Sequence, residues 1–197
     1  NYITTRNYNV IIMGHDNSRF KNLKNEKVFD YSSIRKDILD FFLIKNCYGY
    51  ISDCTGLDYL AFALKKPMLL NSPFLNYFFN KHQKIIYILK NQYILNKNKQ
   101  LNLKEMLYEY NTMFKVKSEF YENNKIMLQD NNPLEILEAY KQLESLIENN
   151  RCEKRIKNYS ERFWSEYKKF LDDKKYREKN HYDSGPYPII YDNIKLD

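Results

Sequence analysis

Residues 50–61, YISDCTGLDYLA, and residues 65–70, KKPMLL, decide the expected fold. The apolar stretch before Asp53 predicts a strand, the polar residues after it predict a turn, and the apolar residues at helical spacing beyond predict a short helix. Pro67 ends that helix and opens a second strand, because the residue before a proline avoids the helical conformation. The order strand, helix, strand is typical of a parallel α/β sheet.

The same alternation extends along the chain. Asn132-Pro133-Leu134-Glu135 is a strong helix start, with a capping asparagine, a proline at the first helical position and a glutamate three residues after the cap. We therefore predict a Rossmann-like, mostly parallel sheet with flanking helices over residues 1–150, and a C-terminal helix with an irregular extension over 151–197 that packs back on it. The expected strands are 10–13, 28–31, 48–52, 68–71, 85–89 and 126–129, and the expected helices are 33–42, 57–64, 103–110, 132–147 and 160–171.

Composition limits the class of protein. Apolar residues make up 43% and charged residues 29% of the 197 residues, which excludes a disordered, collagen-like or coiled-coil chain. Three widely spaced cysteines favour neither a disulfide framework nor a zinc site, and we expect a reducing, cytoplasmic setting. The longest apolar run, residues 59–64, is too short to span a membrane. Because the sequence begins with asparagine and not methionine, we expect it to be a fragment or a processed piece.

The net charge of +7 is unevenly distributed. Residues 59–104 contain eight lysines and no acidic residue, which indicates either a surface that faces anions or a solvated lysine face. Aromatic residues interleave with these lysines, as in proteins that bind single-stranded nucleic acid, although buried strand positions explain them equally well.

The turn over residues 53–56 is the candidate anion site. A helix that begins directly after a strand has unpaired backbone N–H groups, and its dipole favours negative charge at that end. Gly56 has no Cβ to block a phosphate, the Thr55 hydroxyl adds a donor, and Asp53 holds the turn together. The alternative is an ordinary capped helix start, since Asp, Thr and Gly are common turn residues.

The motifs and their order resemble the donor-binding half of GT-B glycosyltransferases. The loop is similar to that of ADP-heptose transferases, although Asp58 stands where those enzymes have histidine. The wider pattern over residues 8–73 resembles a group of bacterial surface-polysaccharide glycosyltransferases. It consists of Met13-Gly14, Asp30-Tyr31, Asp40-Phe41-Phe42-Leu43, Cys47, Thr55-Gly56-Leu57, Pro67 and Asn71-Ser72-Pro73.

This resemblance implies that the chain is the C-terminal, donor-binding half of a GT-B fold, that the N-terminal acceptor domain is missing, and that a nucleotide-sugar is its donor substrate. The donor diphosphate would lie on Thr55, Gly56 and Leu57, with Gly14 lining the same crevice. The resemblance implies that His15, Asn71 and Glu135 contact the nucleotide or ribose, and that Arg35 is a supporting cation. Each of these four polar residues has a structural alternative. His15 would then be an exposed loop residue, Asn71 a turn residue, Glu135 a capping carboxylate and Arg35 a surface position.

The resemblance also implies a metal-independent transfer, because fixed amides and cations can stabilise the leaving diphosphate and no Asp-x-Asp motif occurs in the sequence. We expect no cofactor and no bound metal, a glycan or lipid-linked acceptor, a cytoplasmic location with a peripheral contact at the inner face of the membrane, and no specific nucleic acid. The chain alone is expected to bind donor without turnover. Two alternatives stay open: a nucleotide-sugar epimerase of the same architecture, and a non-enzymatic basic module that binds nucleic acid or membrane surfaces.

Overall fold

The computed structural model describes the chain except residues 1, 15–23, 54, 76–83, 116 and 174–186. The chain divides into two compact units, Asn1–Asn46 and Cys47–Asp197. The boundary that the sequence suggested at residue 150 remains a prediction. Each unit is described by itself.

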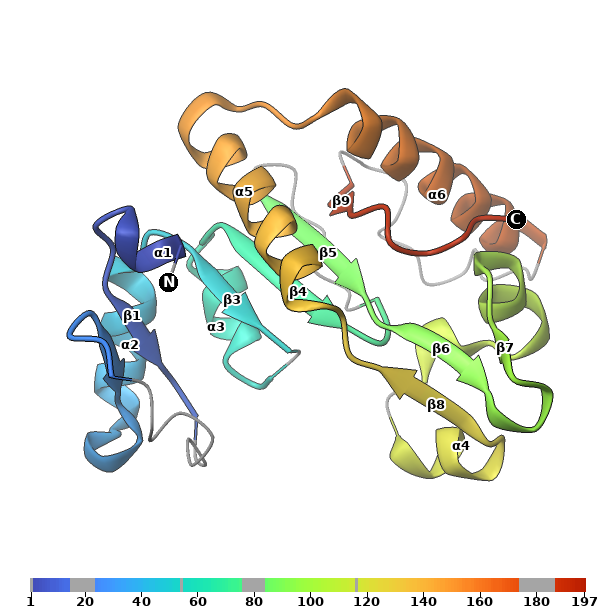
Figure 1. The fold of residues 1–197 in the computed structure, drawn as a ribbon, viewed down its shortest axis with the longest axis horizontal. Coiled ribbons are helices and arrows are strands. Elements are labelled where there is room, and N and C mark those ends of the chain that lie inside the picture. The colour runs from blue at the N-terminus through green and yellow to red at the C-terminus, as the bar shows by residue number, and fades with distance from the viewer. Residues whose placement is uncertain (1, 15–23, 54, 76–83, 116, 174–186) are drawn as a thin grey trace. The chain divides into compact units, whose positions relative to one another are not determined.

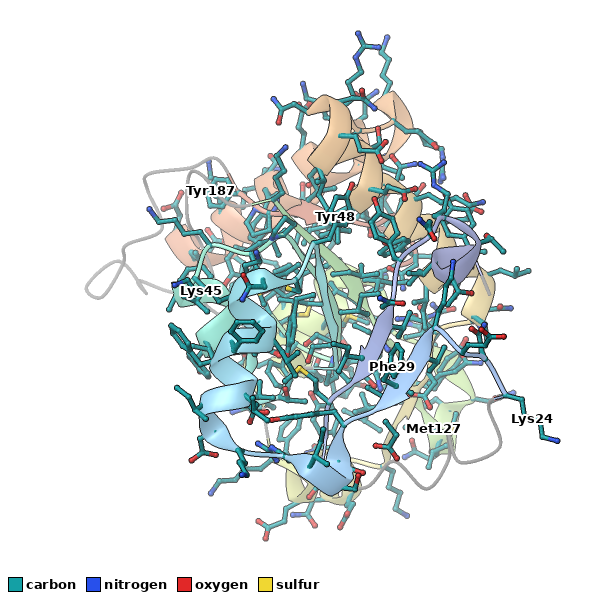
Figure 2. All side chains as sticks on the ribbon, turned by 90° about the vertical axis from the view of Figure 1, so that its left-hand side faces the viewer. Lys24, Phe29, Lys45, Tyr48, Met127 and Tyr187 are labelled. Atoms are coloured by element: carbon teal, nitrogen blue, oxygen red, sulfur yellow. The ribbon has the colours of Figure 1, made fainter. Side chains whose placement is uncertain are left out.

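The first unit contains a two-stranded parallel sheet. It comprises α1 (Tyr2–Thr5), β1 (Val10–Ile12), β2 (Val28–Asp30), the 3-10 turn η2 (Ser32–Ile34) and α2 (Asp37–Asn46). Ile11 and Phe29 face each other across the two strands and are 41% and 50% exposed. Figure 2 shows the side chains of Phe29 on β2 and of Lys45 on α2.

The predicted helix start at Ser33 is wrong. Residues Ser32–Ile34 form the single turn η2, and Arg35 then has extended backbone angles (φ −58°, ψ 132°), which interrupts the helical path. The Tyr31 hydroxyl accepts a hydrogen bond from the Lys36 N–H (3.0 Å) and so holds this break in place. The helix α2 therefore begins at Asp37.

The second unit is built on a four-stranded parallel sheet in the order β3-β4-β5-β9. These strands are β3 (Tyr50–Ser52), β4 (Met68–Ser72), β5 (Ile85–Leu89) and β9 (Ile189–Ile190), and α3 (Asp58–Ala63) connects β3 to β4. Every residue of β4 and β5 is buried, as expected for central strands of a parallel sheet covered on both faces. The predicted α/β fold with a mostly parallel sheet and flanking helices is confirmed.

Two long helices flank this sheet. The helix α5 (Pro133–Asn149) contacts β4 and β5, and α6 (Lys154–Asp173) contacts β9 (Figure 1). The predicted capping box of α5 is present: the Asn132 side chain accepts from the Leu134 N–H (2.9 Å), and Glu135 accepts from the Asn132 N–H (2.8 Å). Because capping is a local interaction, the sequence reveals it directly.

A three-stranded antiparallel sheet, ordered β7-β6-β8, extends from the carboxyl end of β5. Only β8 of this sheet was predicted, and the helix predicted over 103–110 is a short π-helix instead. The elements are β6 (Asn91–Ile94), the 3-10 turn η3 (Leu95–Lys97), β7 (Lys99–Gln100), the π-helix η4 (Glu105–Glu109), the 3-10 turn η5 (Thr112–Phe114), α4 (Ser118–Asn123) and β8 (Ile126–Gln129).

The tail over 187–197 contributes a strand that the sequence did not predict. Ile190 is fully buried and pairs with Tyr87 of β5, while Pro188 accepts a hydrogen bond from the Trp164 indole N–H (2.7 Å) on α6. The Trp164 ring also stacks on Tyr187, with ring centroids 4.8 Å apart. The described part of the tail is therefore part of the core; residues 181–186 lie outside the described residues.

We expect Ile190→Ala to lower the free energy of unfolding by roughly 2–5 kcal/mol, because it leaves a cavity against β5. The matched variant Ile189→Ala, one residue away and only partly buried, should cost clearly less. Urea denaturation measures both. Equal, small losses for the two variants would contradict the placement of β9 in the core.

Candidate functional site

The four parallel strands end at one edge of the sheet, and polar residues follow them there. Lys90 comes directly after β5, and its Nζ lies 2.8 Å from the Asp130 carboxylate and 4.0 Å from that of Asp53, which follows β3. The Lys90 side chain is only 15% exposed, whereas Asp53 and Asp130 are 61% and 86% exposed. This edge therefore combines one fixed cation with two exposed carboxylates, in the place where open α/β sheets bind ligands.

Asn71 on β4 lies at the same edge and is buried. Its Oδ1 accepts a hydrogen bond from the Asn131 side chain (2.7 Å), and Asn131 in turn accepts one from Asn193 (3.0 Å). Asn131 lies between β8 and α5, and Asn193 follows β9. Asn71 is therefore more than the turn residue that was its structural alternative, since it belongs to a hydrogen-bonded network.

The loop between β3 and α3 is organised by Asp58, whose side chain is fully buried. The Asp58 carboxylate accepts hydrogen bonds from the Thr55 N–H (3.0 Å) and from the Thr55 hydroxyl (3.2 Å). The Thr55 Oγ1 lies 3.4 Å from the Ser52 hydroxyl and 3.5 Å from the Tyr50 hydroxyl. Three hydroxyl side chains, those of Tyr50, Ser52 and Thr55, therefore cluster around one carboxylate.

This arrangement corrects two details of the predicted anion site. The Thr55 amide is not unpaired, and its hydroxyl is not a spare donor, because both hydrogens are directed at Asp58. No described residue accepts a hydrogen bond from the amides of Gly56 and Leu57, and Gly56 is exposed. The amides at 56 and 57 are therefore what the loop offers to a ligand.

Burial changes the pKa of two acidic groups in this cluster, Asp58 and Tyr50. Burial raises the pKa of the Asp58 carboxyl above its usual range, although the hydroxyl groups of Ser52, Thr55 and Tyr50 act in the opposite direction. Burial is also the main cause that raises the pKa of Tyr50 to about 12. The Tyr50 phenol is therefore neutral at physiological pH and acts as a hydrogen-bonding group.

The remaining predicted residues are placed separately. One oxygen of Glu135 serves the capping box of α5, which agrees with its structural alternative. Gly14 and Arg35 belong to the unit Asn1–Asn46, where the Arg35 guanidinium donates to the buried carboxylate of Asp40 (3.0 Å). His15 lies outside the described residues.

The structure brings together Asp53, Thr55, Gly56 and Leu57 in one loop, with Asn71 at the end of the strand next to it. Four residues of the edge were not predicted from the sequence: Asp58, Lys90, Asn131 and Asn193. A signal existed for Asp58, because Thr55-x-x-Asp58 follows the spacing of a capping box. The other three meet through contacts that are distant in sequence, and no local pattern marks them.

Among the described residues, no group of three or more His, Cys, Asp or Glu side chains could hold a metal ion. None of the helices in the described ranges is long and apolar enough to cross a membrane. Comparisons with known protein families, with curated proteins and with solved structures found no match to this chain.

The raised pKa of Asp58 gives a pH-dependent stability. The folded state binds this proton more tightly than the unfolded chain, where the carboxyl titrates near about 3.9. The contribution of Asp58 to stability is therefore present below that value and is lost as pH rises through the raised native pKa.

We accordingly expect the free energy of unfolding of the wild type, relative to Asp58→Asn, to fall as pH rises from about 3.5 to 7. Urea denaturation at several pH values measures this difference. The control Glu122→Gln removes an exposed carboxylate on α4, and it separates the effect of burial from that of losing a negative charge. A difference for Asp58→Asn that grows with pH would contradict the assignment.

Proposed function

We propose that this chain is the nucleotide-sugar donor-binding domain of a glycosyltransferase. The observation that carries the proposal is that two groups that favour an anion lie at one edge of the sheet. These are the amides of Gly56 and Leu57, from which no described residue accepts a hydrogen bond, and the ammonium group of Lys90. Lys90 is tied to the loop through Asp53, because its Nζ lies 4.0 Å from that carboxylate.

The chemistry of a nucleotide-sugar matches both kinds of group at this edge. Its diphosphate is an anion that backbone amides and a lysine can bind. Its ribose and sugar carry hydroxyl groups, which donate hydrogen bonds to carboxylates such as the exposed Asp53 and Asp130. A simple anion without hydroxyl groups could not donate hydrogen bonds to these carboxylates.

In the proposed reaction, negative charge develops on the nucleoside diphosphate as the bond to the sugar breaks. The fixed amides and Lys90 stabilise that charge without reorganisation, which lowers the barrier. The acceptor would be a glycan or a lipid-linked glycan on the cytoplasmic side of the membrane. We assign no general base within this chain.

Gly56→Val provides a sharp test, because the fold can accept the change. A Cβ at Gly56 would meet no heavy atom within 4 Å, so the free protein should melt within a few degrees of the wild type. We expect UDP, GDP or ADP to raise the melting temperature of the wild type, since a ligand at 100 times its Kd adds about 2.7 kcal/mol. The valine side chain should abolish this increase by covering the amides.

The matched control is Gly49→Ala at the opposite end of β3. There a Cβ would lie 3.7 Å from Ile147 Cδ1, which is an ordinary contact, so this variant should retain the full response to ligand. No response of the wild type to any of the three nucleotides would overturn the proposal. So would binding of RNA with steep salt dependence that Gly56→Val leaves unchanged.

A further inference from the structure

Three asparagine side chains form a continuous hydrogen-bonded row at the carboxyl edge of the parallel sheet. The Asn193 Nδ2 donates to Asn131 Oδ1 (3.0 Å), and the Asn131 Nδ2 donates to Asn71 Oδ1 (2.7 Å). Asn131 and Asn71 are buried, so these bonds are shielded from water. We call Asn193, Asn131 and Asn71 the asparagine row.

The backbone of β5 fixes the direction of this row. The Asn193 Nδ2 also donates to the carbonyl oxygen of Leu89, the last residue of β5. A carbonyl oxygen can only accept, so the amide of Asn193 must turn its NH₂ group toward β5. The two hydrogens of that group then serve Leu89 and Asn131, and each following amide is oriented in the same sense.

This orientation determines which polar group Asn71 can offer to a further partner. Its oxygen is used by Asn131, so the group that it has left for another partner is its NH₂. No described residue accepts a hydrogen bond from that NH₂. Lys90 is close by, because it follows the neighbouring strand and its N–H donates to the Ser72 carbonyl (2.7 Å).

We infer that the asparagine row makes Asn71 an obligate hydrogen-bond donor to a phosphate oxygen of the ligand beside Lys90, with Asn131 and Asn193 as positioning residues that act through it. This inference rests on the proposed function, because it names the atoms of Asn71 that would contact the diphosphate. A free asparagine can rotate its amide and present either an oxygen or an NH₂ group. The row fixes the Asn71 amide in one orientation, so a ligand that presents only a hydrogen-bond donor at this position is disfavoured.

A double-mutant cycle tests the coupling, with inorganic pyrophosphate and UDP as probes and calorimetry to measure Kd. We expect Asn71→Ala to raise Kd by about tenfold, the effect of losing a hydrogen bond to a charged group. Asn193→Ala should raise Kd by about threefold although it does not touch the ligand, and should have no further effect when Asn71 is already alanine. Asn149→Ala, at the far end of α5, is the control that changes nothing.

Melting curves establish that the variants are folded at the assay temperature. Asn131→Ala interrupts the row at a second position. Its effect should also vanish in the Asn71→Ala background. Independent, additive effects of Asn193→Ala and Asn71→Ala would overturn the inference while leaving the proposed function intact. Failure of the wild-type protein to bind pyrophosphate and UDP would overturn both.

The direction of the row can be measured without a ligand. In the NMR spectrum of the free protein, the side-chain NH₂ groups of Asn193 and Asn131 should exchange slowly with water, because both are hydrogen-bonded. That of Asn71 should exchange faster, and it should become protected when pyrophosphate is added. An Asn71 NH₂ group that is already protected in the free protein would show that the row runs in the opposite direction.

Discussion

The pairing of β4 with β5 is the constraint on which the second unit depends. Both strands are buried along their whole length, with β3 and β9 on their outer sides. Where the strands pair, their backbone polar groups are used by the neighbouring strand, and apolar side chains fill both faces. Polar side chains can therefore gather only where the strands end, which explains why Asp53, Asn71, Lys90 and Asn193 lie at one edge.

The edge combines the Lys90 cation with carboxylates and amides. In the loop after β3, the buried Asp58 carboxylate accepts hydrogen bonds from the N–H and the hydroxyl of Thr55. The loop is therefore held in shape before any ligand binds. These hydrogen bonds offset part of the cost of burying Asp58, and the loop that they hold keeps the amides of Gly56 and Leu57 oriented. Preorganisation of this kind reduces the entropy lost when a ligand binds.

The elements that the sequence predicts well are those whose signals are local. The apolar runs of β4 and β5 and the capping box at Asn132 need only a few neighbouring residues. The residues missed at the edge are joined by contacts such as Asn131 with Asn71 and Asn193 with Asn131, which span 60 and 62 residues. Such contacts follow from the topology of the sheet, and a single sequence does not reveal them. The two-residue strand β9 is too short for a periodic pattern.

The position of β9 also has a consequence for biosynthesis. Its partner β5 is complete about one hundred residues earlier, since Tyr87 pairs with Ile190. While the ribosome adds the residues between them, the outer side of β5 has no strand beside it and its backbone groups are open to wrong partners. Pairs this far apart in sequence also form slowly, because a long loop must close first. The outer side of β5 is therefore the strand edge of this unit that waits longest for its partner during synthesis.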